Sequence, residues 1–219
     1  MRVTYKRPFA QFVKKSRKPL QLVIEDNVEV ICNAPGLGVK KEGDLNDVYV
    51  HKFYFNKQQY LMAYQFEYDA NELKLVWIDF YQIGSHENFY TQLKKFIRIS
   101  WVAVITIKKN KSPIMNQSIT AEEVFAQVRK MSSKERMKFF SLIAMNAFKE
   151  PDLSHEQVFG HLKEDAFSAN EAAEYLEISI PTLRRHVQAG RLKPSSIIGR
   201  NQLFSSSELR LFKQKLSKE

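Results

Sequence analysis

Near its C-terminus the chain shows the apolar and polar spacing of short, capped helices. Ser168 with Glu171 fits a capping box, and small apolar residues then repeat at helical spacing. A second helix is predicted from its cap, Ser179, to Gly190, which can end it in a left-handed conformation. Residues 192–204 have apolar ends around a Gly-Arg turn, as a β-hairpin wing has, and a last helix follows. The pattern predicts a winged helix-turn-helix.

The predicted second helix turns its apolar residues inward, which leaves polar and basic residues on its outer face. Such side chains hydrogen-bond to phosphates and to base edges. Basic residues also concentrate after the turn between the two helices, and acidic residues before it. The sequence therefore indicates a DNA-binding surface, with a module that binds only protein as the alternative. The candidate DNA-contacting residues are Thr182, Arg184, Arg185, Gln188, Arg191, Lys193 and Arg200.

A longer motif runs through this segment and consists of Ser179, Thr182, Leu183, Arg185, Val187, Gly190, Arg191 and Leu192. With this motif the segment resembles the winged helix-turn-helix family of excisionases and MerR-like regulators. The resemblance implies that the second helix enters the major groove of DNA. It also implies that the wing touches the DNA backbone or the minor groove.

The N-terminal part of the chain follows a different pattern, in which strands and helices both occur. Residues 2–5 alternate as a short strand, and apolar residues at helical spacing then predict two helices that end before Pro35. Three β-rich runs separated by polar turns predict an antiparallel meander over residues 48–55, 59–68 and 73–83. Residues 87–96 predict a closing helix. The expected fold class is α+β, with the element order β-α-α-β-β-β-α and an antiparallel sheet.

Three short motifs accompany this order, namely Asn33-Ala34-Pro35-Gly36-Leu37-Gly38, Gly43-Asp44-Leu45 and Gly84-Ser85-His86-Glu87-Asn88-Phe89-Tyr90. With them, residues 1–95 resemble the RelE/ParE family of type II toxins. The resemblance implies a small inhibitor of translation or replication. RelE-type members cut mRNA in the ribosome without a metal, whereas ParE-type members poison DNA gyrase.

Cleavage of RNA needs a base for the 2′-hydroxyl, an acid for the leaving oxygen and cations for the phosphate. The resemblance offers candidates for these roles, which are His51, Lys52, Tyr64, His86 and Tyr90. An arginine that the family often carries on its third strand is absent here, while Tyr64 is kept. A metal-independent endoribonuclease and a non-enzymatic toxin of the gyrase type therefore both stay open, and Tyr64 can equally be a core residue.

Other chemistry has little support in the sequence. His155 and His161 stand at a spacing that does not place them on one helical face for a metal ion, and we expect both at the surface. No metal and no cofactor are expected. The single cysteine, Cys32, excludes an internal disulfide and favours a reducing, cytoplasmic setting.

The segment between the two ends predicts a linker over residues 98–114 and helices over residues 115–165. Capping-box patterns at Thr120 and at Ser132 open two helices whose apolar stripes need a protein surface to cover. We expect that surface to belong to the N-terminal domain. The candidate toxin-neutralising residues are Val124, Phe125, Val128, Phe140 and Ile143.

The organisation of the 219 residues thus becomes a toxin-like domain (1–97), a linker (98–114), a neutralising segment (115–165) and a winged helix-turn-helix (166–219). The net charge of +10 favours a nucleic-acid partner, and no run is long and apolar enough to span a membrane. We expect a fused toxin-antitoxin protein that represses its own operator, as a homodimer. The alternatives are a transcriptional regulator with an inert toxin-like domain and an endoribonuclease localised by its DNA-binding end.

Overall fold

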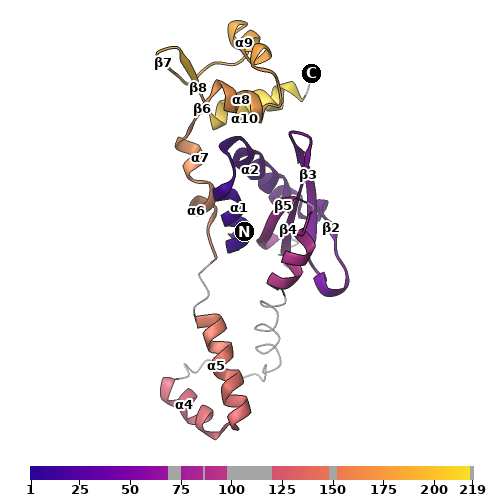
Figure 1. Cartoon of the computed structure of the whole chain (residues 1–219), viewed down its shortest axis with the longest axis vertical. Helices are drawn as coiled ribbons and strands as arrows, with labels where there is room; N and C mark the ends of the chain where they lie inside the picture. Colours follow the sequence, from indigo (N-terminus) through magenta and orange to yellow (C-terminus); the bar gives the residue numbers. More distant parts are fainter. Residues whose placement is uncertain (69–74, 86, 98–119, 148–151, 218–219) are drawn as a thin grey trace. The chain divides into compact units, whose positions relative to one another are not determined.

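The chain forms two compact units, which are described separately. The structure, a computed structural model, describes residues 1–68, 75–85, 87–97, 120–147 and 152–217 (Figure 1). The first unit joins residues 1–93 to residues 152–219, and the second consists of residues 94–151. The N-terminal domain and the C-terminal helix-turn-helix therefore belong to one unit.

A five-stranded sheet in the order β1-β5-β4-β3-β2 forms the centre of the N-terminal domain. Its strands are β1 (Arg2–Tyr5), β2 (Val39–Lys40), β3 (Tyr49–Phe55), β4 (Gln58–Tyr68) and β5 (Leu75–Ser85). The strands β2 to β5 pair antiparallel, which confirms the predicted meander, and β1 joins the edge parallel to β5. Asn56 and Lys57 both have positive φ, the backbone that a tight hairpin between β3 and β4 requires.

Helices cover both faces of this sheet. The helices α1 (Arg7–Lys15) and α2 (Lys18–Asn33) each begin with a proline in the first turn, where a missing N–H costs little (Figure 1). They lie on the face of the sheet that carries His51, whose ring nitrogen is 3.0 Å from the Asn27 amide oxygen of α2. Residues 89–97 are helical, and on the other face of the sheet Gln82 donates to the carbonyl of Phe89, where this helix begins. The predicted α+β class is confirmed.

The C-terminal part of the first unit is built from short elements. They are α6 (His155–Phe159), α7 (His161–Glu164), β6 (Ala166–Ser168), α8 (Ala169–Tyr175), α9 (Ile180–Gln188), β7 (Ser196–Ile198), β8 (Asn201–Ser205) and α10 (Ser206–Leu216). Capping boxes open α6, α8 and α10, at Ser154, Ser168 and Ser205. The wing is a three-stranded sheet in the order β6-β8-β7, because residues 166–168 add a strand that the sequence did not predict.

The second unit contains α4 (Ala121–Lys130) and α5 (Ser133–Ala147). The predicted capping box of Thr120 with Glu123 is present, and the Ser132 hydroxyl accepts the backbone N–H of Glu135. None of the helices in the described ranges is long and apolar enough to cross a membrane.

Candidate nucleic-acid interface and interdomain contact

The helix α9 presents its basic residues to solvent because its apolar residues anchor it from behind. Leu183 is buried, and the His186 ring packs on Phe212 of α10 with 5.0 Å between ring centroids. Arg184 and Arg185 are exposed and make no ion pair within the described part of the chain. The outer face of α9 is therefore a surface of uncompensated positive charge.

The first turn of α9 is held by its cap. The Ser179 hydroxyl accepts the backbone N–H of Thr182 at 3.3 Å, and the two hydroxyl oxygens are 2.8 Å apart. Thr182 is half-buried as a result, whereas Gln188, the last residue of the helix, is exposed. Of these two polar candidates, Gln188 has the freer side chain.

The segment after α9 keeps its basic residues close to the helix. Gly190 has φ +69°, and the backbone N–H of Arg191 returns to the carbonyl of His186 at 2.9 Å. Leu192 is buried and fixes this turn, while Arg191 and Lys193 on either side are exposed. The turn therefore continues the basic surface of α9.

The wing extends this surface to the tip of the β7–β8 hairpin. Gly199 adopts φ +61° at the turn, which a hairpin of this length favours, and the exposed Arg200 follows it. No aspartate or glutamate occurs from residue 178 to residue 207. An anionic ligand therefore meets no like charge from this stretch of sequence. The predicted DNA-contacting residues lie on α9, on the turn that follows it and on the wing, all within one domain.

The opposite side of the helix-turn-helix contacts the N-terminal domain through α10. The guanidinium of Arg210 donates from NH2 to a carboxylate oxygen of Glu25 and from Nε to one of Asp26, both at 2.7 Å. The Tyr175 hydroxyl donates to Asp26 at 2.6 Å, and His155 Nε2 is 3.0 Å from Glu25. Two adjacent carboxylates of α2 thus bind three elements of the C-terminal part.

This network sets the protonation of Glu25. Burial of its carboxyl opposes ionisation, but the hydrogen bond from His155 and the charge of Arg210 outweigh burial and lower its pKa below the usual value. The pKa of the Tyr175 hydroxyl is raised, mainly by burial and also by the charge of Asp26. The Glu25 carboxylate is therefore bound in its charged form by groups of the C-terminal part, which hold the domains together.

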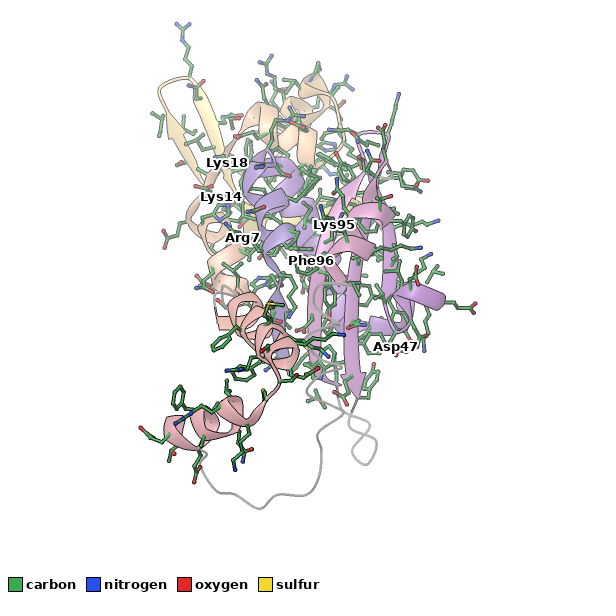
Figure 2. The ribbon with its side chains drawn as sticks, turned by 60° about the horizontal axis from the view of Figure 1, so that its bottom comes forward. Arg7, Lys14, Lys18, Asp47, Lys95 and Phe96 are labelled. Carbon is green, nitrogen blue, oxygen red and sulfur yellow. The ribbon has the colours of Figure 1, made fainter. Side chains whose placement is uncertain are left out.

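A second set of polar contacts links α8 and β6 to the other end of the α1–α2 hairpin. Arg17 forms an ion pair with Glu174 at 2.7 Å. Lys18 donates to the carbonyl of Ala166 at 3.0 Å, and it stands where α2 begins (Figure 2). The backbone N–H of Asn56, in the β3–β4 turn, donates to the Glu177 carboxylate at 2.9 Å. Acidic residues of the helix-turn-helix thus compensate basic residues of the hairpin.

Apolar residues of α6 complete the interdomain contact. Phe159 has no exposed surface, and its ring centroid is 5.6 Å from that of Tyr5 and 6.4 Å from that of Phe9. Tyr5 and Leu153 exchange backbone hydrogen bonds in both directions at 2.9 Å. The apolar cores of the two domains are therefore one continuous cluster.

The candidate catalytic residues Tyr64, His51 and Lys52 have separate surroundings within the N-terminal domain. Tyr64 is fully buried, and its hydroxyl donates to the carbonyl of Pro35 at 2.7 Å and accepts the N–H of Gly38 at 3.0 Å. His51 lies beneath α2, and burial lowers the pKa of its ring. Lys52 follows it on the strand and points to the opposite face, where it is exposed.

Of the other two catalytic candidates, the structure describes Tyr90, which follows the last strand of the sheet. Tyr90 is half-buried at the start of the helix 89–97, and the Lys41 ammonium lies 5.5 Å from its ring centroid. His86 lies outside the described residues. Burial raises the pKa of Tyr64 to about 12, despite the hydrogen bond from Gly38. The buried Tyr64 therefore agrees with the core role that the sequence left open.

The candidate neutralising residues belong to the second unit. Val128 is buried, whereas Val124, Phe125 and Phe140 are exposed. The side chain of Ile143 lies outside the description. The apolar stripe of α4 and α5 is thus only partly covered.

Sequence reasoning missed several residues of the interdomain contact. His155 was expected at the surface, but it is half-buried between the Tyr5 hydroxyl at 2.8 Å and Glu25. His161 is exposed as expected, yet its Nε2 is 2.8 Å from the side-chain oxygen of Gln21. One signal was available, because Glu25 and Asp26 are adjacent carboxylates that directly follow the apolar run Leu22-Val23-Ile24 of α2. Within the described part of the chain, no group of acidic, histidine and cysteine side chains could hold a metal ion.

The fold and these surfaces define a mixed α/β domain joined to a winged helix-turn-helix. The family of ParE-like toxins of type II bacterial toxin-antitoxin systems matches residues 3–94, and a helix-turn-helix domain family matches residues 166–217. The chain therefore carries a ParE-like toxin domain and a helix-turn-helix domain, a combination that fits a toxin-antitoxin fusion with DNA binding. Searches of curated proteins and of solved structures return no match to the chain.

Proposed function

We propose that this protein is a fused toxin-antitoxin pair whose C-terminal half neutralises the toxin domain and represses transcription from its own operator. The observation that carries the proposal is the double ion pair of Arg210 with Glu25 and Asp26. It joins a helix of the DNA-binding domain to a helix of the toxin domain within one compact unit.

Neutralisation on this proposal is occlusion of the α1–α2 hairpin. Phe159 packs edge-on against Tyr5 and Phe9 of the toxin domain, and Arg210 binds the carboxylates of α2. A target that needs this hairpin cannot reach it while α6, α8 and α10 lie on it. The contact is intramolecular, so the effective concentration of the C-terminal half at the toxin domain does not depend on the amount of protein in the cell.

The apolar residues of α4 and α5 are a second proposed neutralising surface. Phe125 and Phe140 are 65% and 58% exposed, which is more than a lone helical hairpin in water favours. Val124, Val128 and Ile143 complete the stripe that we expect to bind the toxin domain.

Operator binding uses the other side of the same domain. Arg184, Arg185 and Gln188 on α9 are exposed while Arg210 is bound to the toxin domain. Neutralisation and DNA binding therefore do not compete for these residues. We further propose that the protein binds as a homodimer, because a helix-turn-helix usually reads a two-fold symmetric operator through two copies.

A growth assay tests neutralisation. Expression of residues 1–97 from an inducible promoter is expected to arrest growth, while expression of the full chain is not. The fragment lacks the packing of Phe159 against the toxin domain. The full chain with Arg210→Glu, which retains Phe159, is therefore tested in parallel. This reversal of charge places a carboxylate against Glu25 and Asp26 and is expected to make the full chain toxic.

The matched control is Lys215→Glu, which makes the same charge change at an exposed residue of α10. It is expected to leave the chain harmless. Harmless growth with the fragment and with Arg210→Glu, both shown to be folded, rejects neutralisation. The protein is then a regulator with an inert toxin-like domain.

That second candidate has one observation in its favour. His51 and Tyr64 bind Asn27 and Pro35, respectively, within the domain, and Lys52 faces the opposite side of the sheet.

If the fragment is toxic, His51→Ala, His86→Ala and Tyr90→Phe separate the remaining alternatives. Relief of toxicity by these changes supports a RelE-like endoribonuclease acting on ribosome-bound mRNA, and unchanged toxicity supports a gyrase-type target.

A further inference from the structure

The wing carries apolar residues that the DNA-binding candidates do not include. Ile197 and Ile198, in β7, are 64% and 66% exposed. They stand directly before the Gly199-Arg200 turn at the end of the hairpin, which projects away from the helices of the domain (Figures 1 and 2). Two adjacent β-branched apolar residues at such a position are costly to leave in water.

The geometry of β7 restricts what can cover both side chains. Successive residues of a strand point to opposite faces of the sheet, so Ile197 and Ile198 project in opposite directions. A flat protein surface can cover one of them only. A groove with a wall on each side of the hairpin can cover both.

The charge around these residues selects an anionic groove. Arg200 follows the two isoleucines at the turn, Lys193 precedes them, and no acidic residue occurs from residue 178 to residue 207. A groove lined by phosphates is complementary to this arrangement, and DNA is the groove that α9 already implies.

A second copy of the chain fits this edge less well. β7 is the outer strand of its sheet but has only three residues, which is too short for a stable strand pair between copies. Two isoleucines also bury far less area than a specific protein interface needs.

We propose that Ile197 and Ile198 insert into the minor groove of DNA beside the major groove that α9 occupies, and that they widen or kink the duplex there. Apolar side chains that enter a minor groove unstack base steps and bend the DNA toward the major groove. Arg200 binds the flanking phosphates, while the isoleucines add preference for easily deformed steps. The inference rests on the proposed DNA binding and names the residues of the wing that determine specificity.

The test compares the full chain with the double variant Ile197→Ser/Ile198→Ser on two DNA duplexes of equal length. One has the sequence upstream of the gene and the other a random sequence, and both carry fluorophores at their ends for energy transfer. Affinity is measured at several salt concentrations, and bending is measured as the change in transfer on binding. The double variant is expected to bind at least about tenfold more weakly, because burial of one isoleucine is worth more than a tenfold change.

Two further readouts identify the cause of this loss. The salt slope is expected to stay unchanged, because no phosphate contact is removed, and the bend is expected to disappear. Ile197→Val/Ile198→Val, which keeps branched apolar side chains, is expected to retain most of both. Leu211→Ser, at a 59% exposed residue of α10, is the matched control and is expected to behave as the wild type.

Three results overturn the proposal. Unchanged affinity and bending in the double serine variant show that the isoleucines do not touch DNA. A loss of affinity with a lowered salt slope assigns them to phosphate contacts through their neighbours. A change in the sedimentation of the free variant shows that they join two copies instead. Equal affinity of the wild type for both duplexes is a separate outcome. It rejects recognition of the operator but not the role of the isoleucines, because the bend can still be measured on either duplex.

Discussion

Basic residues on the two sides of the helix-turn-helix domain have opposite surroundings. On the side toward the toxin domain, Arg210 is 29% exposed and bound to two carboxylates. On the side of α9 and the wing, Arg184 and Arg200 are exposed and make no ion pair with any described residue. One side is a completed protein interface and the other is an open one.

This difference shows how one small domain can serve two partners. Basic residues bound by carboxylates hold a fixed geometry and add little to the field that attracts an anion. Basic residues without partners add fully to that field. On the proposed function, the domain binds DNA without releasing the toxin domain, and substitutions on the two sides should have separable effects.

The largest effect is expected on the toxin-facing side from Phe159→Ala. The side chain has no exposed surface and packs on Tyr5 and Phe9, so its removal leaves a cavity and costs about 3–5 kcal/mol of unfolding free energy. Chemical denaturation followed by circular dichroism measures it. Phe125→Ala, at a 65% exposed residue of α4, is the control and should change stability far less. Equal losses in both variants contradict the continuous core.

The next largest effect is expected from Arg210→Ala. Its loss leaves Glu25, with a side chain 9% exposed, without its guanidinium partner and should cost about 2 kcal/mol, below the cost at a fully buried pair. The same denaturation experiment measures it, with Lys215→Ala as the control on the same helix. The comparison between the two sides fails if Arg210→Ala changes DNA affinity more than stability.

On the DNA-facing side, Arg184→Ala is expected to cost about 1–3 kcal/mol of binding free energy if Arg184 makes a bidentate contact with a base. Sequence preference should relax at the contacted position, while the stability of the free protein stays the same. Titration of promoter DNA and of random DNA measures both quantities. A uniform loss on all sequences assigns Arg184 to phosphate instead.

A smaller effect is expected from acid. Because the pKa of Glu25 is lowered in the folded protein, the unfolded chain binds a proton at this carboxyl more readily. The stabilisation is complete above the usual pKa of glutamate, about 4.3, and disappears as the pH falls through the lower folded value. Unfolding free energy is measured from about pH 6, where this stabilisation is complete, down through that window, and it should fall less steeply in Glu25→Gln than in the wild type. Parallel curves contradict the role given to the network.

The smallest effect is expected from Arg200→Ala at the turn of the wing. A contact with phosphate alone weakens binding to all sequences alike and lowers the salt slope by about one. Titrations at several salt concentrations measure it. A change in sequence preference without a change in slope would show that Arg200 reads bases.

Much of the local structure could be predicted from the sequence. The capping boxes at Thr120 and Ser168, the left-handed Gly190 and the order of strands in the toxin domain all appear in the structure. Each depends on residues a few positions apart, because the hydrogen bonds of a cap and the backbone angles of a turn are set by neighbouring residues. The basic surface of α9 was predictable for the same reason, since helical spacing alone turns Arg184 outward once Leu183 is inward.

The chemistry of the toxin domain could be predicted only in part. Residue types and the family motifs placed His51, Lys52 and Tyr64 among the candidates. Their surroundings came from tertiary structure, which turns Lys52 to one face of the sheet and places His51 under α2. The first two are neighbours in sequence, but the alternation of a strand separates their side chains.

Local sequence patterns are enough to identify the two domains and to predict the outward charge of the DNA-binding helix. The contact between the two domains is visible only in the folded chain. Arg210 and Glu25 are 185 residues apart, and no local pattern relates them. Apolar burial has no direction, so the packing of Phe159 and its neighbours determines which surfaces of the two domains meet. Charged side chains such as Arg210 and Glu25 then form ion pairs across the surfaces that this packing has brought together.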